Sequence, residues 1–441
     1  MDNQKLYLET KPRRLFFKAA IPGGISMVVA SLYMVFDSVF VGKLVGTTAF
    51  AALGLAFPLV IINFALSDLI GVGSSVPISI FLGRKENDKA NNYFTCASLM
   101  IFLTGLVMGL LMYFLAPLFM RLMGAEGELA AYGTQYIRIY AVFSPLTTMT
   151  FALDNFLRIS GKIKTSMMLN VVMSLGTVVL ELLLILGFEL GLAGSALGAN
   201  ISFTLAVLFG IAMFAFGRLQ LKFVRPVFSG AMIRQIVKNG LPNFLNNVSG
   251  RIFSIVMNIM LLGMGGEAAV AVYGIMMTVG SVAEQILYGV LDALQPAVGY
   301  NFGAGRMDRV RAIEKYCFSF GATISVAAAI LIFTFPKMLA LPFLEDISLM
   351  PMAEHALRLC SFTYLVKWFG NAVQSMFAAL ERPFVALCIS ISSACVFPLL
   401  LIAVLLPLAL DGLWLNYTVT AYLTAILAFF LMRRHKALLH S

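Results

Sequence analysis

Charged residues are scarce in this 441-residue chain, because Asp, Glu, Lys and Arg together make up only 12% of it. Soluble domains contain about 25% charged residues, so the composition excludes an ordinary soluble protein. Apolar residues reach 60%, and the mean hydropathy is +0.93. Together these values indicate a protein that crosses a membrane many times.

Histidine and cysteine are also rare, with 3 and 5 residues respectively. His355, His435 and His440 form no metal-binding motif, and the cysteines lie in or beside apolar stretches without metal-ligand spacing. The sequence contains no nucleophile elbow and no phosphate-binding loop. We therefore expect no enzyme, no cofactor and no direct ATP hydrolysis.

Long apolar stretches fill most of the chain, and hydropathy divides them into twelve segments. They cover residues 15–42, 47–80, 91–119, 133–157, 165–188, 192–216, 234–263, 268–300, 314–341, 353–380, 384–408 and 411–432. A helix of about 20 residues crosses a hydrocarbon core about 30 Å thick, and every segment reaches that length. The expected fold class is an all-α membrane protein with twelve transmembrane helices.

Basic residues outnumber acidic ones by 31 to 21, and most of them fall in alternate loops. If the N-terminus is cytoplasmic, only Lys43, Arg121 and Lys337 lie in the outside loops. This is the positive-inside pattern, which predicts that both termini are cytoplasmic. The net charge of +10 is thus an orientation signal and does not indicate a nucleic-acid partner.

The chain repeats itself at an offset of 220 residues, on either side of a polar linker at residues 218–238. The stretch Lys18 to Pro22 matches Lys238 to Pro242. The matches continue from Gly46, Gly54, Gly83, Asp88 and Arg138 to Gly266, Gly274, Gly303, Asp308 and Arg358. Because each half has six segments, a pseudo-two-fold axis along the membrane normal should relate them. We expect an N-lobe at residues 1–217 and a C-lobe at residues 239–441 with a cavity between them, which is the plan of a transporter.

Acidic residues inside the apolar segments are the most informative feature, because a charge there costs roughly 2.5–3.5 kcal/mol on insertion scales. Asp37 lies 19 residues beyond Lys18, which is about 28 Å of helix. Glu181 lies 17 residues beyond Lys164, which is about 25 Å. The two side chains are therefore expected to meet in the outer half of the N-lobe, where unpaired carboxylates bind a cation or a proton.

Polar neighbours are expected to complete this coupling site. Tyr33 lies one turn before Asp37, and Thr177 lies one turn before Glu181, each on the same helical face. With Asn200 they supply the oxygen ligands that a hard cation needs. Asp37, Glu181 and Thr177 are the expected ligands if the ion is Na⁺.

Further polar residues inside the apolar segments are candidates for the substrate cavity. They are Asp68, Asn170, Glu284 and Asp292. Glu284 and Asp292 share a helical face at a spacing of eight residues. They either line the central cavity or pair with Arg251 and Lys367, which lie in the same half of the chain.

Several stretches together resemble a known family. The opening IPGGISMVVASLYMVFDSVFVGKLVG, the run GVGSSVPISIFLGRKENDKA and the later GLAGSALGANIS and LQPAVGYNFGAGRMDRVR resemble the multidrug and toxic compound extrusion (MATE) transporters. The similarity is to the prokaryotic DinF-like and MepA-like branch and covers nearly the whole chain. It implies two six-helix lobes that alternate between outward- and inward-open states. It also implies export of bulky, often cationic amphiphiles in exchange for Na⁺ or H⁺.

The resemblance implies roles for individual residues. Asp37 falls on the family's acidic position in the first helix, and Tyr33 on an aromatic one turn before it. Pro22 falls on the proline about which that helix is thought to bend. On the fifth helix the family commonly has Asn-x-x-x-Asp, where this chain has Thr177 and Glu181. The hydroxyl and the longer carboxylate favour protons over Na⁺.

Asp154 and Asn155 stand on the fourth helix, where the family usually has amides. The additional acid makes both residues candidates for coupling. Asp154 also lies four residues before Arg158, a spacing that equally fits a residue marking the cytoplasmic interface.

The expected function is a secondary antiporter that acts as a monomer in a prokaryotic cytoplasmic membrane. It would export lipophilic, mostly cationic drugs in exchange for H⁺ or Na⁺. A flippase for lipid-linked oligosaccharides or lipids is the alternative, but it would need cationic cavity residues to meet pyrophosphate. Here the buried acids outnumber the buried bases by six to two. A channel fits poorly with two fused pseudo-symmetric lobes.

Overall fold

The computed structural model describes residues 5–217, 219–291, 294–344 and 346–435, and within these ranges the chain forms helices and turns without a β-strand. Its contacts divide it into two units. The first comprises Met1–Tyr7 and Ile25–Gly240, and the second comprises Leu8–Gly24 and Leu241–Ser441. In the division expected from sequence, the whole first helix lies in the N-lobe, so the two divisions differ at residues 8–24.

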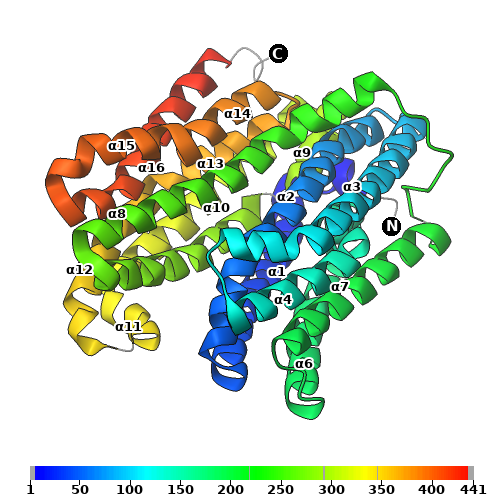
Figure 1. Ribbon diagram of the computed structural model, residues 1–441. Helices are drawn as coiled ribbons and strands as arrows, with labels where there is room; N and C mark the ends of the chain where they lie inside the picture. The colour runs from blue at the N-terminus through cyan, green and yellow to red at the C-terminus, as the bar shows by residue number, and fades with distance from the viewer. Residues whose placement is uncertain (1–4, 218, 292–293, 345, 436–441) are drawn as a thin grey trace. The chain divides into compact units, whose positions relative to one another are not determined.

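The helices of the first half follow one another with short connections (Figure 1). They are α1 (Pro12–Phe40), α2 (Thr47–Gly83), α3 (Asn87–Leu122), α4 (Gly127–Thr147), α5 (Thr150–Ile159), α6 (Ile163–Leu182) and α7 (Gly191–Phe216). Single π-helical turns occur at Lys5–Glu9, Val41–Val45 and Leu183–Gly187. Within the first unit, α2, α3 and α4 pack against one another, and α7 packs on α4 and α6.

The second half begins with a long helical stretch whose first turns belong to the first unit and which is interrupted at Gly266, where the backbone is not helical. The helices are α8 (Gly230–Leu291), α9 (Gln295–Gly303), α10 (Met307–Thr334), α11 (Pro336–Ala340), α12 (Met350–Ser361), α13 (Thr363–Ala379), α14 (Pro383–Ile391), α15 (Phe397–Leu405) and α16 (Ala409–Arg434). Within the second unit, α13 packs against α10 and α16, and α15 packs against α16. A cluster of buried side chains around Met276, Leu357 and Trp414 forms the core of this unit.

The predicted transmembrane segments can all be located in these helices. Eight stretches of the described chain are long and apolar enough to cross a membrane. Two of them, Gly230–Gly303 and Pro383–Arg434, each contain two predicted segments. The predicted segments 133–157 and 353–380 consist of two helices each, because α4 gives way to α5 after Thr147 and α12 to α13 after Ser361. The chain is an integral membrane protein with twelve such segments.

The 220-residue repeat is also visible in the backbone angles. A positive φ, which only a few residues tolerate, occurs at Gly46 and Gly266 and again at Lys85 and Gly305. The same offset relates Gly161 to Glu381 and Glu189 to Ala409, which also have positive φ. The two halves therefore end and begin their helices at equivalent positions, even where the residue is not glycine.

Glycines let α2 and the first turns of α8 approach each other closely within the first unit. A Cβ atom at Gly240 would overlap the carbonyl oxygen of Leu69, and one at Gly73 would overlap that of Ile236. Small residues at helix contacts are typical of membrane proteins, where packing and not the hydrophobic effect holds helices together.

Substituting Gly240 by Ala is therefore expected to destabilise the protein by about 1–3 kcal/mol, as overpacking of a tight contact does. The matched control is Gly250→Ala on the same helix, because a Cβ atom there meets nothing within 4 Å. Thermal unfolding of the purified protein in detergent measures both. Equal unfolding midpoints for the two variants would show that α2 and α8 can accommodate the additional methyl group without loss of stability.

Candidate functional site: an acid pair in the first unit

Asp37 and Glu181 lie together in the first unit, as their depths along α1 and α6 lead one to expect. The hydroxyl of Ser195 lies 3.0 Å from Oδ1 of Asp37 and 3.0 Å from Oε1 of Glu181. Ser195 therefore lies within hydrogen-bond distance of both carboxyl groups. A hydroxyl has one proton, so Ser195 donates to one carboxylate at a time. The remaining negative charge requires a proton or a cation between the two acids.

The close approach of α7 to α6 explains why Glu181 is buried, with only 1% of its surface exposed. Gly194 and Gly198 lie one turn apart on α7, and each faces the backbone of the segment that ends α6. A Cβ atom at Gly198 would lie 2.7 Å from the Glu181 amide nitrogen. The pattern Gly-x-x-x-Gly thus brings the two helices together, and Ser195, the residue after Gly194, reaches both acids.

Two of the candidate ligand oxygens are buried and lack a hydrogen-bond partner within the described ranges. They are Oε2 of Glu181 and Oδ1 of Asn200, whose amide nitrogen donates to the Ala196 carbonyl. Buried oxygens are normally paired, so an unpaired oxygen on Glu181 leaves room for a further partner at the acid pair. The two carboxylates and the Ser195 hydroxyl form a donor set made only of oxygen. Such a set fits a proton or a hard cation such as Na⁺.

The other expected members of this site are placed less favourably for coordination. Thr177 is fully buried on α6, but its hydroxyl donates to the carbonyl oxygen of Met173. Its oxygen keeps lone pairs and remains able to accept a bond. Tyr33 is half-buried on α1. On α4, Tyr136 and Tyr140 form a buried aromatic pair with ring centroids 4.9 Å apart.

Asp154 belongs to a separate ionic cluster on α5 and α6. Its Oδ2 lies 2.8 Å from Nη2 of Arg158, and its Oδ1 accepts from the amide of Asn170 at 2.7 Å. The hydroxyl of Ser166 also donates to Oδ1, and Nε of Arg158 donates to that hydroxyl. The Tyr7 hydroxyl donates to the carbonyl oxygen of Arg158. Both carboxylate oxygens of Asp154 thus have partners, and one of these partners is Asn170, which was expected in the substrate cavity.

The remaining candidates divide between the two units. Asn155 and Asp68 are half-buried on α5 and α2 of the first unit. In the second unit, Glu284 forms an ion pair with Lys367, which resolves the pairing that the sequence left open, since Arg251 is exposed. Asp292 lies outside the described residues. Pro22 lies inside α1, which continues through it as a helix.

Ser195 is the site residue that sequence reasoning missed. The stretch GLAGSALGANIS was noted only as a family-like run, yet its Gly194-x-x-x-Gly198 spacing marks a helix face that packs closely. A serine beside such a face is positioned to contact the neighbouring helix. The spacing marks the face, but the residues that Ser195 contacts depend on how α7 is rotated against its neighbours.

Comparison with known proteins agrees with this architecture. The family model MatE matches residues 22–183 and 242–404. The chain is 29% identical over 393 residues to the "Multidrug export protein MepA" of Staphylococcus aureus (strain MRSA252), covering 86% of this chain and 84% of that protein. It is 27% identical over 386 residues to the protein of the same name from Staphylococcus saprophyticus, with the same coverage.

Solved structures share the fold. "Crystal structure of MATE in complex with MaL6" superposes with a TM-score of 0.94 at 22% identity, over 100% of this chain and 99% of the other. A MOP superfamily transporter from Pyrococcus furiosus, described as having a binding pocket of reverse polarity, superposes with a TM-score of 0.93 at 23% identity, over 100% of this chain and 99% of the other. The family model covers both halves of the repeat and includes Asp37 and Glu181. The chain therefore belongs to the MatE family.

Proposed function

We propose that this protein is a secondary antiporter that exports lipophilic, mostly cationic drugs in exchange for H⁺ or Na⁺. The observation that carries the proposal is the pair of membrane-embedded carboxylates, Asp37 and Glu181, joined through Ser195. Proteins rarely keep acids at such depth without using them to bind or carry a cation. The name of the Staphylococcus relatives supports drug export as the transport reaction.

In the proposed cycle, a cation that enters from outside binds between Asp37 and Glu181 and neutralises them. The loss of charge favours a different arrangement of α1, the helix that bears Asp37 and contains Pro22. Drug is then released outward, because ion and drug favour different conformations of the protein. The cation subsequently leaves on the cytoplasmic side, and the acids regain their charge.

The coupling ion is expected to be H⁺. Two carboxylates and a hydroxyl can share a proton without further ligands, whereas Na⁺ needs several oxygens around it. On α7, Asn200 Oδ1 and Thr204 Oγ1 are buried oxygens without a hydrogen-bond partner within the described residues. Na⁺ is the alternative coupling ion, and the transport experiment described below tests both ions.

The proposed orientation has both termini in the cytoplasm, in the cytoplasmic membrane of a prokaryote, and the working unit is a monomer. The distribution of Lys and Arg between the loops supports the orientation. The substrates proposed are amphiphilic cations, because the intramembrane acids outnumber the bases.

The test is ethidium transport by the full chain in lipid vesicles with an imposed gradient of either H⁺ or Na⁺. We expect ethidium to move against its own gradient when H⁺ flows the other way, and not with a Na⁺ gradient alone. Transport driven only by Na⁺ would assign the second ion. If neither gradient moves ethidium or related cations, drug export is wrong, and lipid translocation should be assayed in the same vesicles.

A further inference from the structure

Glu314 is a second buried acid, in the second unit, that the proposed coupling site does not use. It lies on α10, seven residues after Met307, and only 8% of its surface is exposed. Its Oε1 has no hydrogen-bond partner among the residues that the structure describes. A buried carboxylate without a partner is costly unless its charge is removed. Oε1 of Glu314 is therefore expected to bind a proton, a water molecule or an ion.

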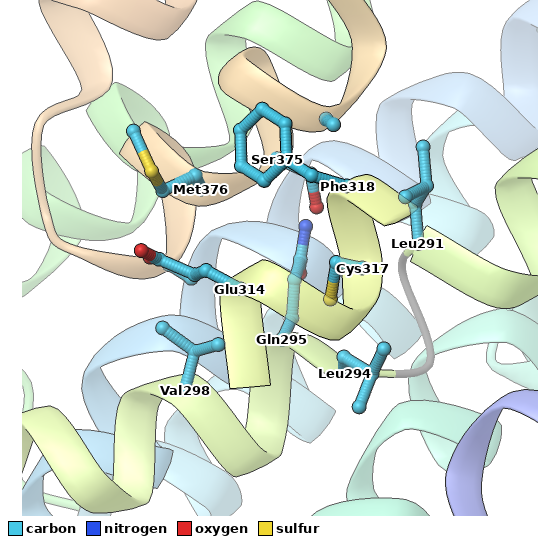
Figure 2. A pocket seen from close by; sticks show the side chains of 11 residues that line it. Leu291, Leu294, Gln295, Val298, Glu314, Cys317, Phe318, Ser375 and Met376 are labelled. Carbon is cyan, nitrogen blue, oxygen red and sulfur yellow. The ribbon is translucent and has the colours of Figure 1, made fainter. Parts of the chain in front are cut away.

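A small cavity adjoins this side chain. It has about 20 Å³ of space for the centres of water molecules, enough to hold one water. Leu291, Leu294 and Val298 form much of its wall, and Gln295 and Ser375 add polar groups. Figure 2 shows the Glu314 carboxyl group pointing toward the side where Met376 lies, whereas Gln295 points toward Ser375. Glu314 thus faces a cavity that can bring it a single water.

No basic side chain lines this cavity within the described ranges. On α10, Arg311 and Lys315 flank Glu314 but are exposed, and Cys317 is the neighbouring titratable group on the cavity wall. Helix α9 carries no charged residue, and its titratable Tyr300 is buried. The one charged residue of α13, Lys367, is paired with Glu284. Arg311, an exposed residue of the same helix, is thus the charged side chain that acts on Glu314, and none of the described residues that line the cavity is basic.

The nature of the ligand follows from the atoms near the carboxylate. Na⁺, K⁺ and Ca²⁺ require several oxygen ligands, but Glu314 faces a thioether and apolar walls, and the amide of Gln295 is directed elsewhere. A proton needs only one carboxylate oxygen, and the other partner can be a single water. These atoms favour a proton over any metal ion.

We propose that Glu314 binds and releases a proton during the transport cycle, so that the second unit has a protonation site separate from the acid pair of the first. The proton passes from a hydronium ion in the cavity water to a carboxylate oxygen, so that one O–H bond breaks as another forms and neutral water is left, and release reverses this step. Coupled to drug movement, this site would add one proton to those exchanged at Asp37 and Glu181.

The test is infrared difference spectroscopy of the full chain in lipid vesicles, recorded on changing the pH and on adding ethidium. Wild-type protein should show a change in the carbonyl stretching band of a protonated carboxyl group that Glu314→Gln lacks. The band should persist in Glu267→Gln, an exposed acid of α8, and in Asp37→Asn. Because the pH-induced band does not depend on transport, the result stands even if ethidium is not a substrate.

A second variant guards against misfolding. Glu314→Asp keeps a carboxyl group on a shorter side chain, so the band should remain at a shifted frequency. With a pH-sensitive dye, Glu314→Gln should release one proton fewer per protein on ethidium addition than Glu267→Gln does. Identical difference spectra for wild type and both Glu314 variants would overturn the proposal, because Glu314 would then keep one protonation state throughout.

Discussion

Replacing Asp37 by Asn or Glu181 by Gln is expected to abolish gradient-driven drug export. Each change keeps the size of the side chain but removes the negative charge that attracts the coupling cation. The two acids share one hydroxyl, at 3.0 Å from each, so neither retains the original site when the other is neutral. Loss of one charged ligand should weaken cation binding at least about tenfold, which corresponds to 1.4 kcal/mol.

The measurement is the initial rate of ethidium movement in vesicles with an imposed gradient of the coupling ion. Glu189→Gln is the matched control, because this glutamate lies in the same unit but is exposed. Ser195→Ala should have an intermediate effect, since it removes the bridging hydroxyl but neither charge. If both neutral variants transport as fast as the wild type, the acid pair is a structural feature, and coupling belongs to another acid.

Replacing Arg158 by Met is expected to destabilise the protein by about 3–5 kcal/mol, as removing one partner of a buried ion pair does. Only 6% of the Arg158 side chain and 14% of the Asp154 side chain are exposed. Without the guanidinium, the Asp154 carboxylate keeps hydrogen bonds from Ser166 and Asn170 but no compensating charge. The midpoint of thermal unfolding in detergent measures the loss.

The double variant Asp154→Asn with Arg158→Met should recover most of this stability, because it removes both charges together. The single variant Asp154→Asn distinguishes two roles for Asp154. If Asp154 only balances the charge of Arg158, the single variant Asp154→Asn should lower the unfolding midpoint, and the protein that stays folded should transport normally. If Asp154 instead serves in coupling, as the family resemblance implies, Asp154→Asn should lose gradient-driven transport without a comparable loss of stability.

The pairing of Asp37 with Glu181 was predictable because depth in a helix follows from counting residues at 1.5 Å each. The positive-inside pattern supplied a common starting level for α1 and α6, so two acids at similar depth were expected to meet. The twelve segments followed equally directly from hydropathy. These predictions depend on distance along the helix axis, which the sequence determines.

Rotation about the helix axis, in contrast, depends on how neighbouring helices pack. The sequence therefore did not select Ser195 or show that the amide of Asn170 donates to Asp154. It also left two basic partners open for Glu284, and the ion pair with Lys367 became evident only in the folded structure. The interruptions after Thr147 and Ser361 were missed because the apolar pattern continues across both.

The chain passes between its two units at defined points, and two of these points are related by the 220-residue repeat. The chain crosses after Tyr7, after Gly24 and after Gly240, and the last two crossings lie inside α1 and α8. Pro22 and Pro242, equivalent residues of the repeat, stand next to these crossings. The crossings within α1 and α8 therefore fall at equivalent positions of the repeat, and each half of the chain has one helix that is divided between the two units.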